Sequence, residues 1–460
     1  MSWQATFTAM LPEHILLVGI VALIGLEIAS QARAAFLVSV CVVTAAFIAA
    51  ASLAATGYAM APFPEQFSVA PEALLAKAVV LALAVPVLLI SRNDFADAQF
   101  HILILGSLYG VCLLLSADSF LILFLGIELM SLPVYVLVLL ALQRTESAEA
   151  ALKYLVLGGT ATATLLMGSA LLYGASGSLS LAAFAAALGS SDAMASVGVV
   201  LVIVAFFVKA AIAPFHTWAP DAYEGATVPV TAYMATIVKA GVLLAAVRLF
   251  GMETVPRPMA DMLALLPLAS IVWGNLAAMR QQSFRRMIAY SSIAHAGYLF
   301  YAFLGDGAGR FQAVAFYVLA YGVMNILAFA SLPRAEDDTA RDRLDNLKGL
   351  YQRAPFAAVM IGIAMLSLAG IPPFPGFVAK FLIFRNVFAA GYTTYAVMGL
   401  IASYMGIYFY LRVIQYLFMS PVPSHVQRPP YGRAVLGASF LCLLAGIAIA
   451  VFPGWVIGQF

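Results

Sequence analysis

The residues of this chain best suited to chemistry are lysines inside long apolar segments. The chain has six lysines against seventeen arginines, and Lys209, Lys239 and Lys380 lie well inside such segments. Placing a charge there costs at least roughly 2.5–3.5 kcal/mol, and desolvation favours the neutral amine, so a buried lysine can both accept and release a proton. Arginine stays protonated and would not serve. The lysines therefore predict a proton relay, with structural ion pairs as the alternative.

Two further titratable residues also lie in the middle of apolar segments. Glu128, in LFLGIELMSLPVY, lies near mid-depth, and we pair it with Lys209 because a lysine partner keeps a buried carboxylate charged. A change in their separation would shift the proton affinity of the lysine. His295, in IAYSSIAHAGYLF, lies midway along another segment, and an imidazole passes a proton between its ring nitrogens. A lone histidine in an apolar helix is also often a packing residue. The candidate relay is Glu128, Lys209, Lys239, His295 and Lys380.

These residues belong to a chain with the composition of a membrane protein. Hydrophobic residues make up 64% of the 460 positions and charged residues 10%, with a mean hydropathy of +1.01, whereas soluble domains carry about 25% charged residues. A helical span needs about 20 apolar residues. The sequence predicts an all-α polytopic membrane protein with about fourteen such helices. Their approximate ranges are 13–30, 34–56, 72–91, 99–116, 118–142, 152–174, 196–215, 227–250, 259–280, 284–304, 309–332, 354–388, 392–419 and 433–455.

Prolines interrupt the seventh and the twelfth of these spans. The seventh contains KAAIAPFHTWAPDAYEGATVP and the twelfth contains SLAGIPPFPGFVAKF. Proline removes a helical hydrogen bond, and backbone groups freed at membrane depth must line a cavity or be buried in protein. The breaks are five helices apart, which reverses the direction through the bilayer, so they favour two inverted repeats over packing kinks. The predicted units are an N-terminal three-helix segment (1–98), two five-helix repeats (99–250 and 259–419) and a C-terminal helix (433–460).

The loop cations predict the orientation. With the N-terminus outside, the outside loops hold little more than Arg257 and Arg310. The positive-inside rule then places both termini in the periplasm or its topological equivalent, and we expect the membrane to be a bacterial inner membrane. The first twelve residues carry no lysine or arginine, so we expect the first helix to be retained rather than cleaved. The inside loops hold Arg33, Arg92, Arg144, Arg280, Arg285, Arg286, Arg334, Arg341, Arg343, Lys348, Arg353, Arg428 and Arg433.

Several kinds of function find no support in the sequence. The net charge is +2 with no polybasic segment, which argues against nucleic acid as a partner. The three cysteines are far apart and form no metal-ligand or disulfide pattern. No dinucleotide fingerprint, phosphate-binding loop or thiolate cluster is present. We therefore expect no cofactor in this chain and any electron transfer in other chains. Lys77 and Lys153 lie near predicted helix ends, where we expect them to reach the interface.

The motifs resemble those of a known family. FVKAAIAPFHTWAPDAYEGATVPVTA, NLAAMRQQSFRRMIAYSSIAHAGY, SLAGIPPFPGFVAKF, GIELMSLPVYVL and DNLKGLYQRAP are similar, in the same order, to antiporter-like membrane subunits of respiratory NADH:quinone oxidoreductase, and the WAPDAYEG form to the N type. The resemblance covers about 100–420. It implies fourteen helices with helices 4–8 and 9–13 inverted, a Glu128, Lys209, Lys239 and Lys380 relay with His295 in the connecting path, and neighbouring antiporter-like subunits as partners. It also implies FMN, iron–sulfur clusters and quinone in partner subunits.

Two other functions remain open. A subunit of a multi-chain cation/proton antiporter, or of a related ferredoxin- or hydrogenase-linked complex, would use the same buried lysines. A passive scaffold would need them only for assembly. The WAPDAYEG form favours the redox-driven proton pump.

Overall fold

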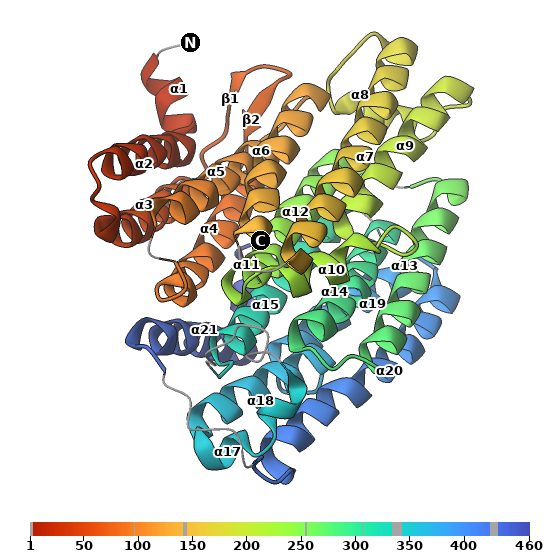
Figure 1. Cartoon of the computed structure of the whole chain (residues 1–460). Helices are drawn as coiled ribbons and strands as arrows, with labels where there is room; N and C mark the ends of the chain where they lie inside the picture. Colours follow the sequence, from red (N-terminus) through yellow and green to blue (C-terminus); the bar gives the residue numbers. More distant parts are fainter. Residues whose placement is uncertain are drawn as a thin grey trace.

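The computed structural model describes residues 3–95, 97–140, 145–253, 255–305, 307–333, 343–423 and 431–460. In these ranges the chain is a bundle of long helices with one two-stranded hairpin (Figure 1). Thirteen of the described helices are long and apolar enough to cross a membrane. The remaining predicted span, 354–388, is divided into two helices of 15 residues. The all-α polytopic fold is therefore confirmed. Arg144, Arg334, Arg341 and Arg428 of the predicted inside loops lie outside the described residues.

The N-terminal segment contacts the rest of the bundle mainly through two of its three spans: α2 packs on the following span, 98–115, and α4 packs on helices of both later groups. An 18-residue stretch is 28% buried in α2 and in α3, whereas the corresponding stretch of α4 is 78% buried. The hairpin strands pair antiparallel just before α4. The elements are α1 (Trp3–Ala9), α2 (Leu11–Ile28), η1 (Ala32–Ala34), α3 (Ala35–Ala55), β1 (Met60–Phe63), β2 (Phe67–Val69) and α4 (Pro71–Ser91).

The next five spans form the first of two groups of helices, and the last of them contains a π-helical turn, η2, directly before Lys239. A π turn arises where one extra residue is accommodated in a helix, often at functional sites. The elements are α5 (Ala98–Leu115), α6 (Phe120–Leu139), α7 (Thr145–Ser176), α8 (Ala182–Ala187), α9 (Ala193–Ala210), α10 (Trp218–Gly225), α11 (Val228–Tyr233), η2 (Met234–Val238) and α12 (Lys239–Phe250).

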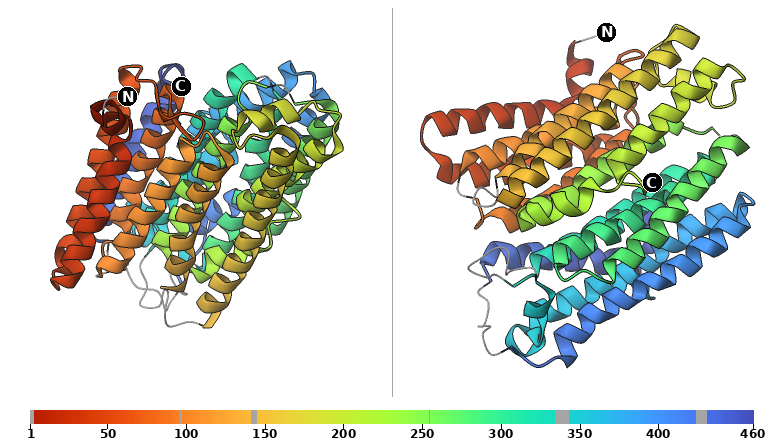
Figure 2. Two further views of the ribbon diagram at one scale, coloured as in Figure 1. Left: turned by 90° about the horizontal axis from the view of Figure 1, so that it is seen from above. Right: turned by 45° about the vertical axis from the view of Figure 1, so that its right-hand side comes forward.

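The second group follows and lies beside the first, as the separation of red-to-yellow from green-to-blue helices shows (Figure 2). The chain ends with a helix that packs on α15 and α4. The elements are α13 (Arg257–Ala278), α14 (Phe284–Tyr301), η3 (Ala302–Leu304), α15 (Gly307–Ala330), η4 (Leu344–Leu347), α17 (Leu350–Arg353), α18 (Pro355–Ala369), α19 (Pro375–Ala389), α20 (Thr393–Met419), α21 (Arg433–Val451) and α22 (Pro453–Ile457).

Both interrupted helices end in the same local conformation. The C-cap of α9 is Ala211, with φ of +61°, and the C-cap of α18 is Gly370, with φ of +83°. Each of these left-handed residues begins a short non-helical segment, AIAPF at 211–215 and GIPPF at 370–374. A left-handed residue ends a helix by turning the chain so that its own N–H and the next N–H donate to the last carbonyls of the helix. The two breaks therefore have similar sequences and the same left-handed backbone geometry at their first residue.

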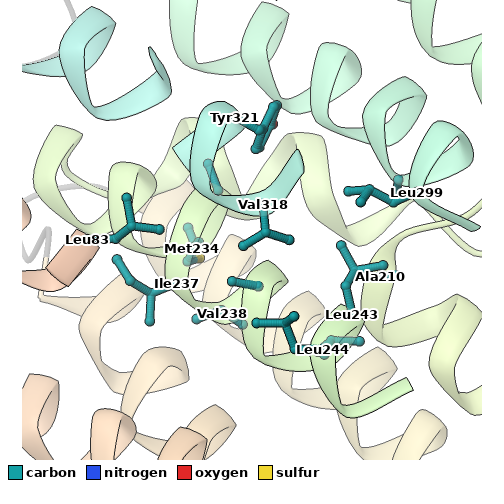
Figure 3. Close-up of a cluster of buried hydrophobic side chains, with 14 of the residues drawn as sticks. Leu83, Ala210, Met234, Ile237, Val238, Leu243, Leu244, Leu299, Val318 and Tyr321 are labelled. Atoms are coloured by element: carbon teal, nitrogen blue, oxygen red, sulfur yellow. The ribbon is translucent and has the colours of Figure 1, made fainter. Parts of the chain in front are cut away.

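Three spans make the centre of the bundle, and two of them carry the relay candidates Lys239 and His295. Val228–Phe250 is buried except for the partly exposed Arg248, and an 18-residue stretch in each of Phe284–Leu304 and Gly309–Ala330 is 94% buried. Apolar side chains from α4, η2 and α15 meet here, including Leu83, Met234 and Val318 (Figure 3). Lys239, which begins α12 in this centre, is therefore almost entirely shielded from solvent.

Candidate functional site

Lys209 and Glu128 lie side by side, as the sequence predicted. Lys209 is the last residue but one of α9, so it stands at the helix break and not in the middle of a continuous helix. Its Nζ is 3.9 Å from Oε1 of Glu128 and donates to the hydroxyls of Ser131 and Tyr135, both at 3.3 Å. Thr162 donates to the same Glu128 oxygen at 2.5 Å. Three hydroxyl side chains thus hold a loose ion pair at the break.

Lys239 has no carboxylate partner among the described residues. Its Nζ donates at 2.8 Å to the backbone carbonyl of Ser292 on α14, and it also donates to the Ser292 hydroxyl. That hydroxyl is 3.4 Å from the hydroxyl of Tyr223 on α10. The side chain is buried, with 6% of its surface exposed. The ammonium group therefore rests on neutral oxygens only.

His295 is held by two tyrosines from different helices. Its Nδ1 is 2.8 Å from the hydroxyl of Tyr317 on α15, and its Nε2 is 3.1 Å from the hydroxyl of Tyr410 on α20. The Tyr410 hydroxyl is also 2.5 Å from that of Ser291. All four side chains are buried. The imidazole is thus hydrogen-bonded on both sides, which a packing role alone would not require.

Lys380 lies on α19 and reaches back to the break before it. Its Nζ donates to the carbonyl of Ala369, the last residue of α18, and to the hydroxyl of Ser403 on α20, each at 3.1 Å. It also lies 5.0 Å from the ring centre of Tyr298. The amine lines a cavity of about 410 Å³ between α19 and α20, whose lining is mostly apolar and includes four phenylalanines. Here too no carboxylate lies within ion-pair distance among the described residues.

The candidates do not form one unbroken hydrogen-bonded chain. Among the described residues, no hydrogen bond between side chains joins the Lys209 cluster to Lys239, and apolar residues such as Ala210 and Leu243 stand in that region (Figure 3). His295 and Tyr317 border a cavity of about 10 Å³ that also touches Ser367. A cavity of that size is about the smallest that holds one water molecule. A proton would therefore need water or side-chain motion to cross these gaps.

The prediction that Lys77 reaches the membrane interface was wrong. Lys77 and Glu13 form an ion pair of 2.5 Å between α4 and α2, and neither side chain is exposed. The prediction considered α4 as an isolated helix, in which a lysine near the end reaches the interface. In the bundle, α2 covers this end of α4 and supplies Glu13 as the partner of Lys77. Lys153, in contrast, is 44% exposed and pairs with Glu149 at 2.7 Å and with Asp221 at 2.8 Å. Only the second lysine fits the prediction.

Charged residues gather around a basin at the end of the bundle where α7, α10 and α14 meet. Its volume is about 390 Å³. Arg286 on α14 contacts Asp221 and Glu224 on α10, both at 2.8 Å. Burial alone would raise the pKa of Asp221, but hydrogen bonds from Lys153 and Arg286 outweigh it and hold that pKa below its usual value. Ion pairs around the basin therefore connect α10, which follows the first break, to α7 of the first group and to α14 of the second.

The sequence did not point to several residues that hold the candidates in place. They are neutral hydroxyl residues, which occur throughout the chain and carry no spacing signal of their own. Only the packing of distant helices shows which of them contact a lysine, a carboxylate or the histidine. They are Ser131, Tyr135, Thr162, Ser291, Ser292, Tyr317, Ser403 and Tyr410.

A polytopic bundle with two broken helices and buried lysines defines an antiporter-like membrane protein. The family described as NADH:quinone oxidoreductase/Mrp antiporter, TM, matches residues 117–406. The chain therefore belongs to the NADH:quinone oxidoreductase/Mrp antiporter family.

Relatives and solved structures agree with this assignment. NADH-quinone oxidoreductase subunit N of Pelobacter propionicus is 37% identical over 96% of this chain and 95% of its own length. That of Chloroflexus aggregans is 40% identical over 78% of this chain and 75% of its own length. A chain of respiratory complex I from Thermus thermophilus has a TM-score of 0.85 and 33% identity, covering 97% of this chain and 98% of that one. A chain of the Mrp complex from Dietzia shares the fold, with a TM-score of 0.86 and 21% identity over 100% and 96% of the two chains.

Proposed function

We propose that this chain is a proton-translocating membrane subunit of a respiratory NADH:quinone oxidoreductase. Protons move at mid-membrane through Glu128, Lys209, Lys239, His295 and Lys380, and electron transfer in other subunits drives them. The similarity to proteins named NADH-quinone oxidoreductase subunit N supports the assembly, because it extends over nearly the whole chain. The chemistry of the buried side chains supports the transport.

The observation that carries the proposal is the kind of partner each buried lysine has. Lys77 shows what a structural ion pair looks like here, with a carboxylate at 2.5 Å and no exposure. Lys239 and Lys380 instead contact hydroxyl and carbonyl oxygens. A fixed charge buried without a counter-ion is costly, whereas an amine that loses its proton avoids that cost. Neutral partners therefore favour lysines that exchange protons over lysines that stabilise the fold.

Matching local structures support the proposed inverted repeats. Helices α6 and α14 begin after Ser119 and Ser283, and each serine hydroxyl accepts from a backbone N–H three residues later at 3.2 Å. Each serine also pairs antiparallel with a residue of a later segment, Ser119 with Ser180 and Ser283 with Arg343. Together with the shared break geometry, these features support repeat units at 99–250 and 259–419.

The same proposal extends to location and partners. We place the chain in a bacterial inner membrane with both termini in the periplasm, and the two termini lie at the same end of the bundle (Figure 2, left). Neighbouring antiporter-like subunits cover parts of its surface. FMN, iron–sulfur clusters and quinone belong to other subunits of the complex, and this chain supplies no redox centre.

The test is NADH-driven proton pumping in membrane vesicles that hold the assembled complex. Lys239→Met and Lys380→Met should leave the complex assembled and lower pumping about tenfold or more, because a positioned proton-transfer group contributes at least that much. The control is Lys348→Met, since Lys348 pairs with Asp345 at 2.7 Å on a partly exposed segment. Normal pumping in both relay variants would overturn the proposal, and loss of assembly that accounts for all lost activity would favour a scaffold.

Mild purification separates the redox-driven complex from a multi-chain antiporter. The proposal predicts that flavin- and iron–sulfur-containing chains purify with this one. A complex that lacks such chains yet exchanges protons for another cation would instead identify an antiporter.

A further inference from the structure

The contacts of His295 point to a longer proton-conducting unit than the sequence suggested. Three hydrogen-bonding steps connect Ser291, Tyr410, His295 and Tyr317, with separations of 2.5, 3.1 and 2.8 Å. These residues come from α14, α20 and α15, so the unit exists only when three helices are packed together. Each member is exposed by 4% or less.

Every member of this unit is able both to donate and to accept a hydrogen bond. A neutral imidazole has one N–H and one bare nitrogen, and a hydroxyl group donates one hydrogen while accepting others. The unit therefore has two arrangements of opposite direction. In one, Tyr410 donates to Nε2 and Nδ1 donates to Tyr317; in the other, Tyr317 donates to Nδ1 and Nε2 donates to Tyr410.

We propose that Tyr410 and Tyr317 are the proton-transferring partners of His295, and that the proton crosses the histidine through both hydroxyls. The proposal rests on the proposed function. A proton that reaches the Tyr410 oxygen allows the Tyr410 proton to move to Nε2. The Nδ1 proton moves to the Tyr317 oxygen, and the original Tyr317 proton leaves on the far side. One proton enters and one leaves, and no residue changes its net charge.

The two ends of the unit lie near the neighbouring lysines. Ser291 is adjacent in sequence to Ser292, which accepts from Lys239. Tyr317 borders the cavity of about 10 Å³ beside Ser367, and this cavity also touches Ala379, the residue before Lys380. A single water molecule there would be the acceptor at the far end. The unit thus bridges the region between the two lysines.

Each transfer reverses the direction of the unit. After one proton has passed, Nε2 carries the hydrogen and Tyr317 donates to Nδ1. A second proton in the same direction must wait until the hydroxyls and the imidazole hydrogen have returned to the first arrangement. This return separates successive transfers, which suits a pump that moves protons in discrete steps.

The test compares His295→Gln, Tyr317→Phe and Tyr410→Phe in the assembled complex, with NADH-driven proton pumping and NADH oxidation as readouts. Each tyrosine variant keeps the ring and removes only the hydroxyl, and we expect pumping to fall about tenfold or more. Tyr301→Phe is the matched control, because Tyr301 is also buried on α14 and its hydroxyl has no hydrogen-bond partner among the described residues. It should pump normally.

The outcomes distinguish this inference from the proposed function. If His295→Gln abolishes pumping while both tyrosine variants pump normally, the inference is wrong and the relay stands. If none of the three variants, nor Lys239→Met, lowers pumping, the relay itself is wrong. If a phenylalanine variant does not assemble, a difluorinated tyrosine at the same position keeps the hydroxyl and makes it more acidic. The inference then predicts a shifted pH profile of pumping, whereas an unchanged profile contradicts it.

Discussion

Lys209 and Glu128 face each other with 3.9 Å between Nζ and Oε1, and no hydrogen bond joins them. The lysine instead donates to two neutral hydroxyls, and the carboxylate accepts from Thr162. Coulomb attraction in a medium of low dielectric constant changes strongly with distance. A small movement of the broken helix would therefore alter the attraction between the two groups, and with it the ease with which the lysine releases a proton.

We expect Thr162 to affect proton pumping by positioning the Glu128 carboxylate. Thr162→Val removes a hydrogen bond of 2.5 Å to the carboxylate while keeping the shape of the side chain. A hydrogen bond to a charged group contributes about 1.5–3 kcal/mol, so we expect proton pumping to fall about tenfold or more in the assembled complex. Thr160→Val is the control, since its hydroxyl bonds only to Val156 of its own helix, at 2.9 Å. Equal pumping in the two variants would contradict a positioning role for Thr162.

The buried Glu13–Lys77 pair should stabilise the packing of α2 beside α4 within the N-terminal segment. Lys77→Met leaves the Glu13 carboxylate buried without its partner, which typically costs about 3–5 kcal/mol. We expect a clearly lower thermal unfolding temperature for the complex. The double variant Glu13→Leu/Lys77→Met should recover most of the loss, because neither charge remains. A double variant no more stable than Lys77→Met would show that the pair is not the source of the effect.

The charged basin between α7, α10 and α14 should make the stability of the protein depend on pH. Because contacts with Lys153 and Arg286 lower the pKa of Asp221 from its usual 3.8, its charge stabilises the folded state above that pH. The stabilisation is lost as the pH falls through the lowered pKa. Asp221→Asn should therefore lower the unfolding temperature at pH 7 and make no difference in strong acid. The effect is small, under about 1 kcal/mol, since the side chains remain partly exposed. A difference that persists in strong acid would contradict this account.

Gly376 should be essential for the second break. A methyl group there would lie 1.9 Å from the carbonyl oxygen of Ser367, closer than atoms can approach. The Gly376 backbone N–H also donates to the Ser367 hydroxyl at 3.0 Å. Gly376→Ala should therefore displace α19, which carries Lys380, and prevent assembly or pumping. Gly437→Ala is the control, because nothing lies within 4 Å of a methyl group at that position. Normal pumping by Gly376→Ala would show that α19 adapts to the change.

Hydropathy predicted the membrane spans, proline predicted the two helix breaks, and the rarity of lysine pointed to the relay candidates. A helix satisfies its own backbone hydrogen bonds, so each apolar segment of sufficient length becomes a span in a membrane. The two breaks followed from proline, although the spans 196–215 and 354–388 extended beyond the helices that the structure contains. Lys209, Lys239 and Lys380 stood out because few charged residues occur at such depth.

Only the tertiary structure decided which side chains surround those charges. From the sequence, Lys77 was expected at the interface, but in the structure Glu13 on α2 pairs with it. The hydroxyl residues around the relay come from positions up to 119 residues apart in sequence, as in the contact of Ser291 with Tyr410. Whether a lysine faces a carboxylate, a hydroxyl or lipid depends on how helices rotate and pack against one another. That arrangement is set by side-chain packing across the whole bundle, which no local pattern records.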